Sequence, residues 1–364
     1  MKAIKPILAL AAFLLMLTPL QAQQNYEAEL YVEGIDVPWG MAWLPNGDML
    51  VTERSGSLFL IRDGEIVTTI GNLPDDLEAD GQGGFLDVEV HPNYEENGWV
   101  YFSYSYANND GSNTAIVRAQ IVNNALGNIQ DIYKGEPTKT GGRHFGSRIE
   151  FDRDGFLFFT IGDRGNRDEL PQDITKDGGK VYRVHDDGRI PEDNPFVGND
   201  DAKAAIWSYG HRNQQGMAMN PESGVMWAHE HGPRGGDEIN IIKPGVNYGW
   251  PILSFGINYS GTSFAEGTYR EGMEPPATYW DPSIAPSGMT FVTSDIYPDW
   301  KGHLIVGSLK FAQLQLVEID GESVVSRTEK LAGIGRVRSV KQGPDGYIYV
   351  GTTRGGIHRI VPAE

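Results

Sequence analysis

The sequence contains no cysteine, so the chain can form neither a disulfide nor a lipid anchor on a cysteine. Beyond residue 22, no apolar run approaches the roughly 20 residues that a membrane-spanning helix needs. Basic residues are also scarce, because 30 lysines and arginines stand against 49 acids, which gives a formal net charge of −19. Such a chain should repel nucleic acid and anionic lipid, so we expect neither nucleic-acid binding nor membrane insertion.

The first 22 residues have the pattern of a secretory signal that is cleaved from the mature chain. Lys2 and Lys5 precede an apolar run at residues 7–17, and Ala22 is a small residue suited to a cleavage site. A membrane anchor is the alternative, but the run is short for a bilayer. Cleavage removes two lysines and no acids, which leaves a formal charge of −21. We therefore expect a periplasmic or secreted protein whose residues 23–364 form a single domain.

Helical periodicity is nearly absent, and a repeated turn-and-strand pattern takes its place. Turns rich in Pro, Asp, Asn and Gly precede alternating strands at residues 44–52, 91–102, 152–158, 220–227, 297–306 and 343–350. Each copy predicts a β-hairpin. Six copies leave about 57 residues per unit, the size of a four-stranded blade with its loops. The sequence therefore predicts an all-β, six-bladed β-propeller, which a strand at residues 26–32 would close; a β-sandwich or a pair of β domains is the alternative.

Cationic side chains gather at a few places in this acidic chain. Arg336 and Arg338 are two residues apart in a strand-like run, so they project from the same face. Two adjacent guanidiniums repel each other unless an anion lies between them, and their planar forks suit carboxylates. Arg212 with Asn213, and Lys310, occupy similar places in other repeats. Together they predict a polycarboxylate site in the axial mouth, although a solvated strand face would explain the arginine pair alone.

Residues 229–238 combine two histidines, carboxylates and a Gly-Pro turn. Zinc is disfavoured for His229 and His231, because no suitable third ligand is spaced nearby. Main-chain carbonyls of the turn, with Asp237 and Glu238 close in sequence, are the kind of ligand that calcium prefers. A β-turn with capping carboxylates remains the alternative. A long insertion at residues 245–286, rich in Tyr, Trp, Gly and Pro, follows this stretch and is typical of a functional loop.

His144 lies in a polar, glycine-rich loop, where an imidazole can take a proton near neutral pH. Asp163 lies in a Gly-Asp-Arg-Gly turn at the end of the following hairpin, and we expect it to orient that imidazole. Gln82, in the sequence DGQGG, is another polar group on a loop. A lone histidine is usually structural, so the residues alone leave both roles open.

These motifs together resemble the soluble aldose sugar dehydrogenases of the glucose/sorbosone dehydrogenase family, which use pyrroloquinoline quinone (PQQ). The resemblance covers nearly all of the mature chain. Its elements are DGQGG (80–84), HFG (144–146), IWSYG (206–210) with Arg212 and Asn213, EHGPRGGDEIN (230–240), NYGWP (247–251), GINY (256–259) and RVR (336–338). The EHGP run is highly specific, whereas the repeated turns are not.

The resemblance implies roles for named residues. The three carboxylates of PQQ would explain the cations, and the cofactor would be held by Gln82, Arg212, Asn213, Tyr259, Lys310, Arg336 and Arg338. The carbonyls of Gly232 and Pro233 would bind the calcium ion that polarises the quinone, and a second, structural calcium would be held by Glu238 and Tyr248.

The resemblance also implies a reaction. His144 would act as general base, with Asp163 as its orienting partner, while C1 of an aldose gives a hydride to the quinone and the product is an aldonolactone. The reduced cofactor would pass its electrons to an unidentified acceptor. The sugar and the oligomeric state, monomer or homodimer, stay open.

One residue departs from the family pattern, since Arg143 precedes the expected base where a smaller polar residue is more usual. A cation there would either disfavour the imidazolium or select an acidic sugar.

Two other functions remain possible for a propeller: a calcium-dependent lactonase and a module that binds glycans or a protein. Lactonase sites centre calcium on axial carboxylates and amides, whereas the axial candidates here are mainly cationic.

Overall fold

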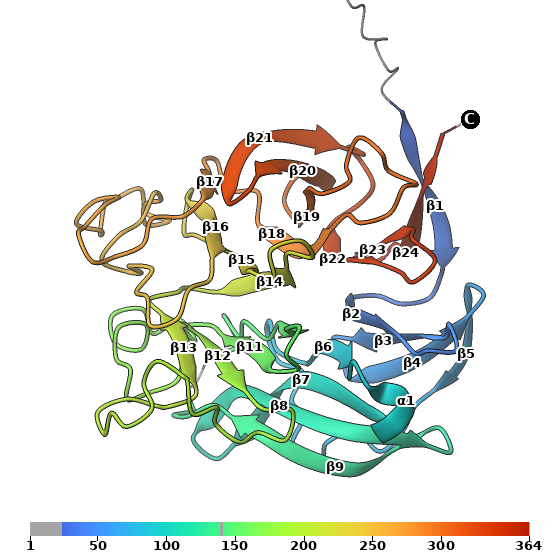
Figure 1. Cartoon of the computed structure of the whole chain (residues 1–364), viewed down its shortest axis with the longest axis horizontal. Helices are drawn as coiled ribbons and strands as arrows, with labels where there is room; N and C mark the ends of the chain where they lie inside the picture. The colour runs from blue at the N-terminus through green and yellow to red at the C-terminus, as the bar shows by residue number, and fades with distance from the viewer. Residues whose placement is uncertain (1–23, 139–140, 364) are drawn as a thin grey trace, which may run out of the picture.

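The computed structural model describes residues 24–138 and 141–363, so the predicted signal sequence lies outside the described residues. The strands form six four-stranded sheets whose neighbours run antiparallel, arranged as blades around a central axis (Figure 1). This confirms the predicted six-bladed β-propeller. The helix α1 (Tyr94–Asn97) is a single turn, and no helix of the described chain is long and apolar enough to cross a membrane.

Five blades consist of four consecutive strands, the first of which lies nearest the axis. The first blade contains β2 (Pro38–Trp43), β3 (Met49–Glu53), β4 (Ser57–Arg62) and β5 (Glu65–Thr69). The second contains β6 (Phe85–Val90), β7 (Trp99–Asn108), β8 (Gly111–Val122) and β9 (Ala125–Lys134). The third contains β10 (Ile149–Phe151), β11 (Leu157–Ile161), β12 (Lys180–Val184) and β13 (Ile206–Tyr209).

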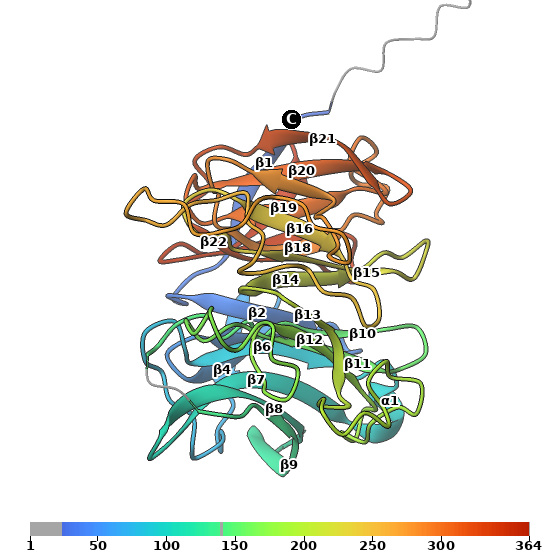
Figure 2. The ribbon, with the colours of Figure 1, turned by 90° about the vertical axis from the view of Figure 1, so that its left-hand side faces the viewer.

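The fourth blade contains β14 (Gln214–Met219), β15 (Met226–Glu230), β16 (Asp237–Ile241) and β17 (Thr278–Trp280). The fifth contains β18 (Pro286–Phe291), β19 (Leu304–Ser308), β20 (Gln313–Asp320) and β21 (Ser323–Lys330). Figure 2 shows these two blades above the second and third when the ring is seen from the side.

The sixth blade joins the two ends of the described chain. It contains β22 (Val337–Gln342), β23 (Ile348–Thr352), β24 (Gly356–Pro362) and, on its outer edge, β1 (Tyr26–Val32). β1 runs antiparallel to β24, with Tyr26 opposite Pro362, and the two strands lie side by side in Figure 1. The predicted closure by residues 26–32 is therefore confirmed.

Apolar side chains fill the spaces between neighbouring blades. Leu50, Phe85 and Phe102 belong to a buried cluster between the first and second blades, and Phe158 and Met217 to one between the third and fourth. Every residue of β3, β11, β15, β19 and β23 is buried, because these strands are covered on both faces. Removal of this apolar surface from water, at roughly 25 cal/mol per Å², holds the blades in the ring.

The six predicted turns each join the first strand of a blade to its second strand, so all of them lie at one end of the ring. The loops that lead into the first strands lie at the other end, together with the loops that join second to third strands. The predicted insertion lies between β16 and β18 and contains β17. It leaves β16 at the end of the repeated turns but crosses to the opposite end, where Asn247 pairs with Tyr209 and Trp250 donates to Asp163. That end also carries the loops before the first strands, and the candidate site is found there.

Candidate active site

A cavity of about 360 Å³ opens on the axis at the end that carries the irregular loops. All six blades contribute to it, through the loops before their first strands and the loops between their later strands. Its lining consists of Val37, Trp39, Arg54, Gly81, Gln82, Leu86, Phe145, Asn213, Gln215, His231, Ala285, Leu309, Arg336, Arg338 and Thr353. This lining contains no Asp or Glu, although the chain has 49 acids.

Three arginines of this cavity have no carboxylate partner among the described residues: Arg54, Arg336 and Arg338. Arg54 and Arg336 each donate to a main-chain carbonyl, at 2.7 and 3.0 Å, and Arg338 donates to Oε1 of Gln215 at 2.8 Å. Burial, followed by the charges of Arg148, Arg336 and Arg54, lowers the pKa of Arg338 to about 9. The guanidiniums therefore repel one another, and a bound anion would relieve that repulsion.

The predicted cofactor ligands fall into two groups. Gln82, Asn213, Arg336 and Arg338 line the cavity itself. The other three lie around it and are Arg212, Lys310 and Tyr259. Arg212 is buried, donates to the carbonyl of His231 at 2.8 Å and lies over the ring of Trp250. Lys310 is exposed beside the lining residue Leu309, and Tyr259 is 74% exposed and does not contribute to the lining.

His144 and Asp163 form the pair that the sequence predicts. Nδ1 of His144 lies 2.6 Å from Oδ1 of Asp163, and the main-chain N–H of His144 donates to Oε1 of Gln82 at 2.8 Å. Asp163 is itself fixed, since it accepts from Nε1 of Trp250 at 2.9 Å and from the N–H of Gly165 at 2.7 Å. With Nδ1 turned to the carboxylate, Nε2 is the imidazole nitrogen left to meet a substrate.

Electrostatics keep this imidazole neutral near pH 7. Burial lowers the pKa of His144, and the charges of Arg212 and Arg143 lower it further, while the hydrogen bond that His144 donates to Asp163 opposes them. Burial raises the pKa of Asp163, but its hydrogen bond to His144 and the charge of His144 outweigh that effect, so its pKa lies below the usual value. The pair is therefore an ionised carboxylate that orients a neutral imidazole.

The predicted metal ligands lie beside the main cavity. Gly232, Glu238 and Tyr248 line a small void of about 10 Å³ together with Glu230 and other residues. Burial, and then the charge of Glu230, raise the pKa of Glu238 well above its usual value. The Tyr248 hydroxyl is engaged within the chain, where it accepts from a main-chain N–H at 3.0 Å and donates to the carbonyl of Ile241.

These donors fit calcium better than they fit a transition metal. In the described chain, no three His, Asp or Glu side chains are grouped to hold a metal. The carbonyl of Pro233 accepts a hydrogen bond from Ser283 at 3.2 Å, and Oδ1 of buried Asn240, beside Glu230 and Glu238, has no partner. Calcium accepts carbonyl oxygens as readily as carboxylates, so a mixed set of this kind suits it.

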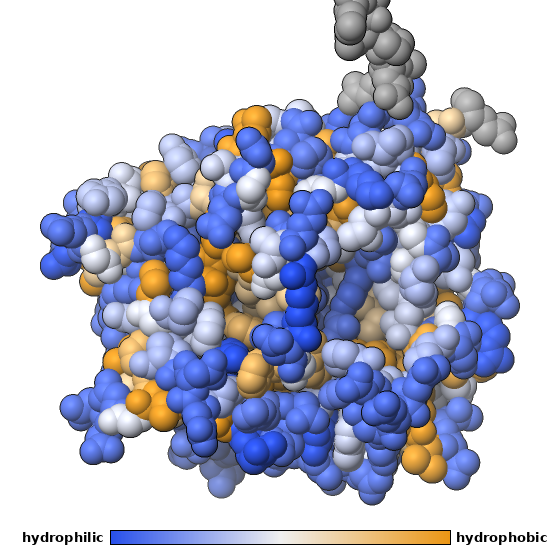
Figure 3. Space-filling view, viewed as in Figure 1, coloured by the Kyte–Doolittle hydropathy of each residue, from blue (hydrophilic) through white to orange (hydrophobic). Residues whose placement is uncertain are grey.

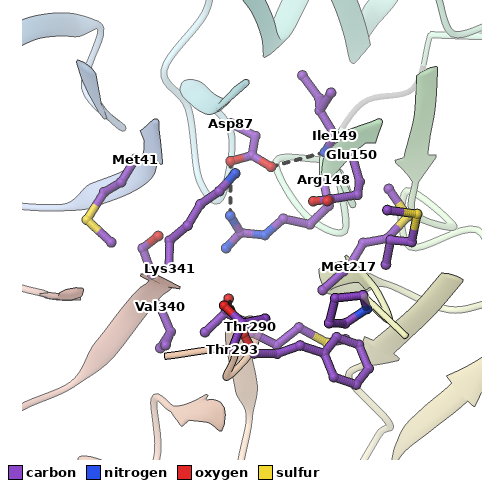
Figure 4. Close-up of a pocket in the computed structure, with 16 residues that line it drawn as sticks. Met41, Asp87, Arg148, Ile149, Glu150, Met217, Thr290, Thr293, Val340 and Lys341 are labelled. Atoms are coloured by element: carbon purple, nitrogen blue, oxygen red, sulfur yellow. Dashed lines mark hydrogen bonds and ion pairs between the residues drawn. The ribbon is translucent and has the colours of Figure 1, made fainter. Parts of the chain in front are cut away.

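A second axial cavity, of about 140 Å³, lies deeper among the innermost strands (Figure 4). Arg148 separates the two cavities. Its Nε donates to the carbonyl of Gln215 at 2.7 Å, its Nη1 pairs with Oδ1 of Asp87 at 3.1 Å, and its guanidinium stacks 4.0 Å from the ring of Trp39. Gln215 and Trp39 both line the larger cavity, called the upper cavity below, whereas Arg148 lines only the second, lower cavity, so Arg148 contacts the walls of the upper cavity from beneath.

The lower cavity has its own charged groups, and Figure 4 shows Asp87, Arg148 and Lys341 turned toward one another. Lys341 is paired with Glu89. Burial raises the pKa of Glu150 to about 8; Lys341 opposes this shift, and Glu89 adds to it.

On the face seen in Figure 3, hydrophilic side chains predominate and the surface is hollowed near the centre of the ring.

The sequence did not indicate Trp39, Arg54 and Gln215, which line the upper cavity, or Arg148, which lines the lower cavity and contacts the walls of the upper one. Arg54 has no counterpart in the repeat, because the position that it occupies after β3 is taken by Thr353 after β23. The other three stand in ordinary strand-like surroundings, and only the closed ring brings them together.

Comparisons with known proteins agree with this geometry. The Glucose / Sorbosone dehydrogenase family matches residues 35–359. The aldose sugar dehydrogenase YliI of Escherichia coli is 41% identical over 337 residues, which cover 90% of each chain.

Two solved structures extend this agreement to three dimensions. The soluble aldose sugar dehydrogenase of E. coli in its apo form superposes with a TM-score of 0.88 at 39% identity and covers 93% of this chain and 100% of that one. The PQQ-bound aldose sugar dehydrogenase of Streptomyces coelicolor superposes with a TM-score of 0.77 at 27% identity and covers 94% and 99%. Sequence and structure together show that the chain belongs to the glucose/sorbosone dehydrogenase family.

Proposed function

We propose that this protein is a PQQ- and calcium-dependent dehydrogenase that oxidises aldose sugars at C1 to aldonolactones. The observation that carries the proposal is an arginine-lined cavity without carboxylates beside the His144–Asp163 pair. Relatives named as aldose sugar dehydrogenases, one of them with PQQ bound, support the same reaction class. A lactonase would centre its calcium on axial carboxylates and amides; this cavity has amides but no carboxylate.

The residues present fit PQQ. Its three carboxylates require cations, and Arg336 and Arg338 supply them without competing acids, with Arg212 and Lys310 close by. Asn213 supplies an amide to the lining. The rings of Trp39 and Phe145 offer flat apolar walls for a planar cofactor. When bound, PQQ supplies the two-electron oxidant.

His144 would act on the anomeric hydroxyl of the sugar. Its Nε2 takes the hydroxyl proton, while Asp163 holds Nδ1–H and stabilises the imidazolium that forms. Because Trp250 and Gly165 hold the carboxylate, the imidazole loses little orientation during the transfer. The lowered pKa of His144 keeps the base available below its ordinary titration range.

Calcium would bind beside this pair. The carbonyls of Gly232 and Pro233 would hold an ion facing the cofactor, where it acts as a Lewis acid. Glu238 and the main-chain carbonyl of Tyr248 would hold a second ion. The charge of that ion would offset the repulsion between Glu238 and Glu230. These ions would also link the loops of the fourth blade to its insertion.

The proposal is tested by dye-linked oxidation of a panel of aldoses. Purified protein is assayed with PQQ and calcium, added together and separately. We expect sugar-dependent dye reduction only with both, and His144→Ala should lower kcat by roughly 100- to 10,000-fold while PQQ still binds. A matched control is His303→Ala, a partly buried histidine near the repeated turns, which should keep full activity.

Two results would contradict the proposal. Activity without PQQ on a lactone would support a hydrolase instead. Failure to bind PQQ in a fluorescence titration, with no sugar oxidation, would leave a propeller whose cationic mouth serves another ligand.

A further inference from the structure

Arg143 is a cation next to the proposed base that has no acceptor for its side chain among the described residues. Its backbone is held, since its N–H donates to the carbonyl of Gly141 at 2.9 Å and its own carbonyl accepts from Arg164. The side chain is exposed, and no carboxylate of the described chain lies within ion-pair distance. A held backbone with an unengaged guanidinium is suited to binding an external anion.

The position of this guanidinium ties it to the site. It lies against Gly165, because a Cβ atom built on that glycine would fall 2.3 Å from Nε and 3.0 Å from Cζ of Arg143. The N–H of Gly165 donates to Oδ1 of Asp163, the oxygen that also faces Nδ1 of His144. Gly165 therefore lies between the guanidinium of Arg143 and the carboxylate of Asp163.

The charge around the site exceeds what the cofactor needs. Arg54, Arg212, Lys310, Arg336 and Arg338 provide five cations for three cofactor carboxylates, and none has a carboxylate partner among the described residues. Arg143 is additional to these five and lies on the side of the base rather than in the cofactor cavity. An excess of unpaired positive charge at this point favours an anionic substrate.

We propose that Arg143 binds the carboxylate of an acidic aldose, so that hexuronic acids are preferred substrates. This inference rests on the proposed function. In a pyranose uronate, the carbon that carries the carboxylate and the anomeric carbon both flank the ring oxygen, so the two groups lie along one edge of the sugar. Adjacent residues have Cα atoms about 3.8 Å apart, so Arg143 and His144 can meet both groups of a single sugar.

The reaction at C1 is that of the neutral sugars, and the carboxylate is unchanged. C1 loses two electrons and two protons; the hydroxyl proton passes to His144, and the electrons with the second proton pass to the bound oxidant. The product is the lactone of an aldaric acid. Arg143 thus contributes to binding and specificity, not to the chemical step.

The test compares glucuronate with glucose on the PQQ- and calcium-loaded enzyme. We expect Arg143→Gln to lower the kcat/KM ratio of glucuronate to glucose by roughly 10- to 100-fold, the range for loss of a charge-assisted hydrogen bond. Arg143→Lys should restore part of that ratio. The control is Arg153→Gln, an exposed arginine in the turn between β10 and β11, at the opposite end of the ring.

A second readout needs no turnover of the acid. Methyl glucuronoside has a blocked C1 hydroxyl, so it should inhibit glucose oxidation competitively, and more strongly than methyl glucoside. That preference should weaken at high salt and disappear in Arg143→Gln. An unchanged substrate ratio and an unchanged inhibitor preference in an active variant would overturn the inference alone. Absence of any sugar oxidation by the wild-type enzyme would overturn the proposed function with it.

Discussion

The two axial cavities are lined by successive parts of the same innermost strands but differ in how their charges are arranged. The upper cavity holds Arg54, Arg336 and Arg338 without an acid in its lining. In the lower cavity each cation has an acid, Asp87 for Arg148 and Glu89 for Lys341. Charges removed from water need a partner. The cations of the lower cavity have carboxylate partners within the chain, so that cavity is structural. The arginines of the upper cavity require a ligand to supply their anionic partners.

Arg148 makes the contrast sharper, because it lines the lower cavity and also contacts residues that line the upper one. Its head group joins Asp87 of the second blade to carbonyls of the fourth and sixth blades, Gln215 at 2.7 Å and Arg338 at 3.4 Å. It thus fixes the floor on which the upper cavity stands. The Asp87–Arg148 pair of the lower cavity thus supports the unpaired arginines of the upper cavity. Substitutions in the lower cavity should therefore reduce stability, whereas substitutions in the upper cavity should reduce ligand affinity.

The largest effect is expected from Asp87→Asn in the lower cavity. Loss of the carboxylate leaves the buried guanidinium of Arg148 unpaired, which should lower the free energy of unfolding by about 3 kcal/mol. Urea denaturation of the apo-protein measures it. Asp193→Asn is the matched control, since Asp193 pairs with Arg183 at 2.9 Å but its side chain is 70% exposed, and its loss should cost less than about 1 kcal/mol. Equal effects in both variants would remove the distinction.

A smaller and opposite effect is expected from Arg338→Gln in the upper cavity. The variant should bind PQQ roughly 10- to 100-fold more weakly, because one charge-assisted contact is lost. The free energy of unfolding of the apo-protein should not fall, since repulsion from Arg148, Arg336 and Arg54 is relieved. Fluorescence titration and urea denaturation give the two values. Lower apo stability with unchanged PQQ affinity would show that the upper cluster is structural too.

The last prediction concerns Glu150, whose pKa is raised to about 8. The folded state holds this proton more tightly than the unfolded state does, so stability should fall as pH rises from about 4.5 to 8. Glu150→Gln should flatten that part of the profile, with Lys341 limiting the change. Unfolding free energies measured at pH 5 and pH 8 for both proteins test this. Identical slopes would show that Glu150 is ionised throughout.

Much of the fold was predictable because its signal is local and repeated. All six turn motifs occur between first and second strands, and residues 26–32 close the ring as expected. The same holds for Arg336 and Arg338, whose spacing of two places both side chains in one cavity. His144 and Asp163 were predictable for a related reason, since one hairpin separates them and returns the chain to the same end.

The remaining site residues depend on contacts between blades, which no local pattern encodes. Arg148 meets Asp87, 61 positions away, and approaches Arg338, 190 positions away, only because the ring closes. Tyr259 illustrates the opposite difficulty. The family resemblance suggests a place beside the cofactor, yet its side chain is 74% exposed on the long insertion, so its proposed role stays a prediction.

The closing pair of strands also sets an order of assembly. Tyr26 meets Pro362, so the sixth blade cannot form until almost the entire chain is available. Contacts so distant in sequence form late, because their loop-closure entropy must be overcome first. The upper cavity draws residues from every blade, so it comes into existence only with this last step. A partly made or truncated chain therefore lacks the complete cavity, and under the proposed function cofactor loading would mark a finished ring.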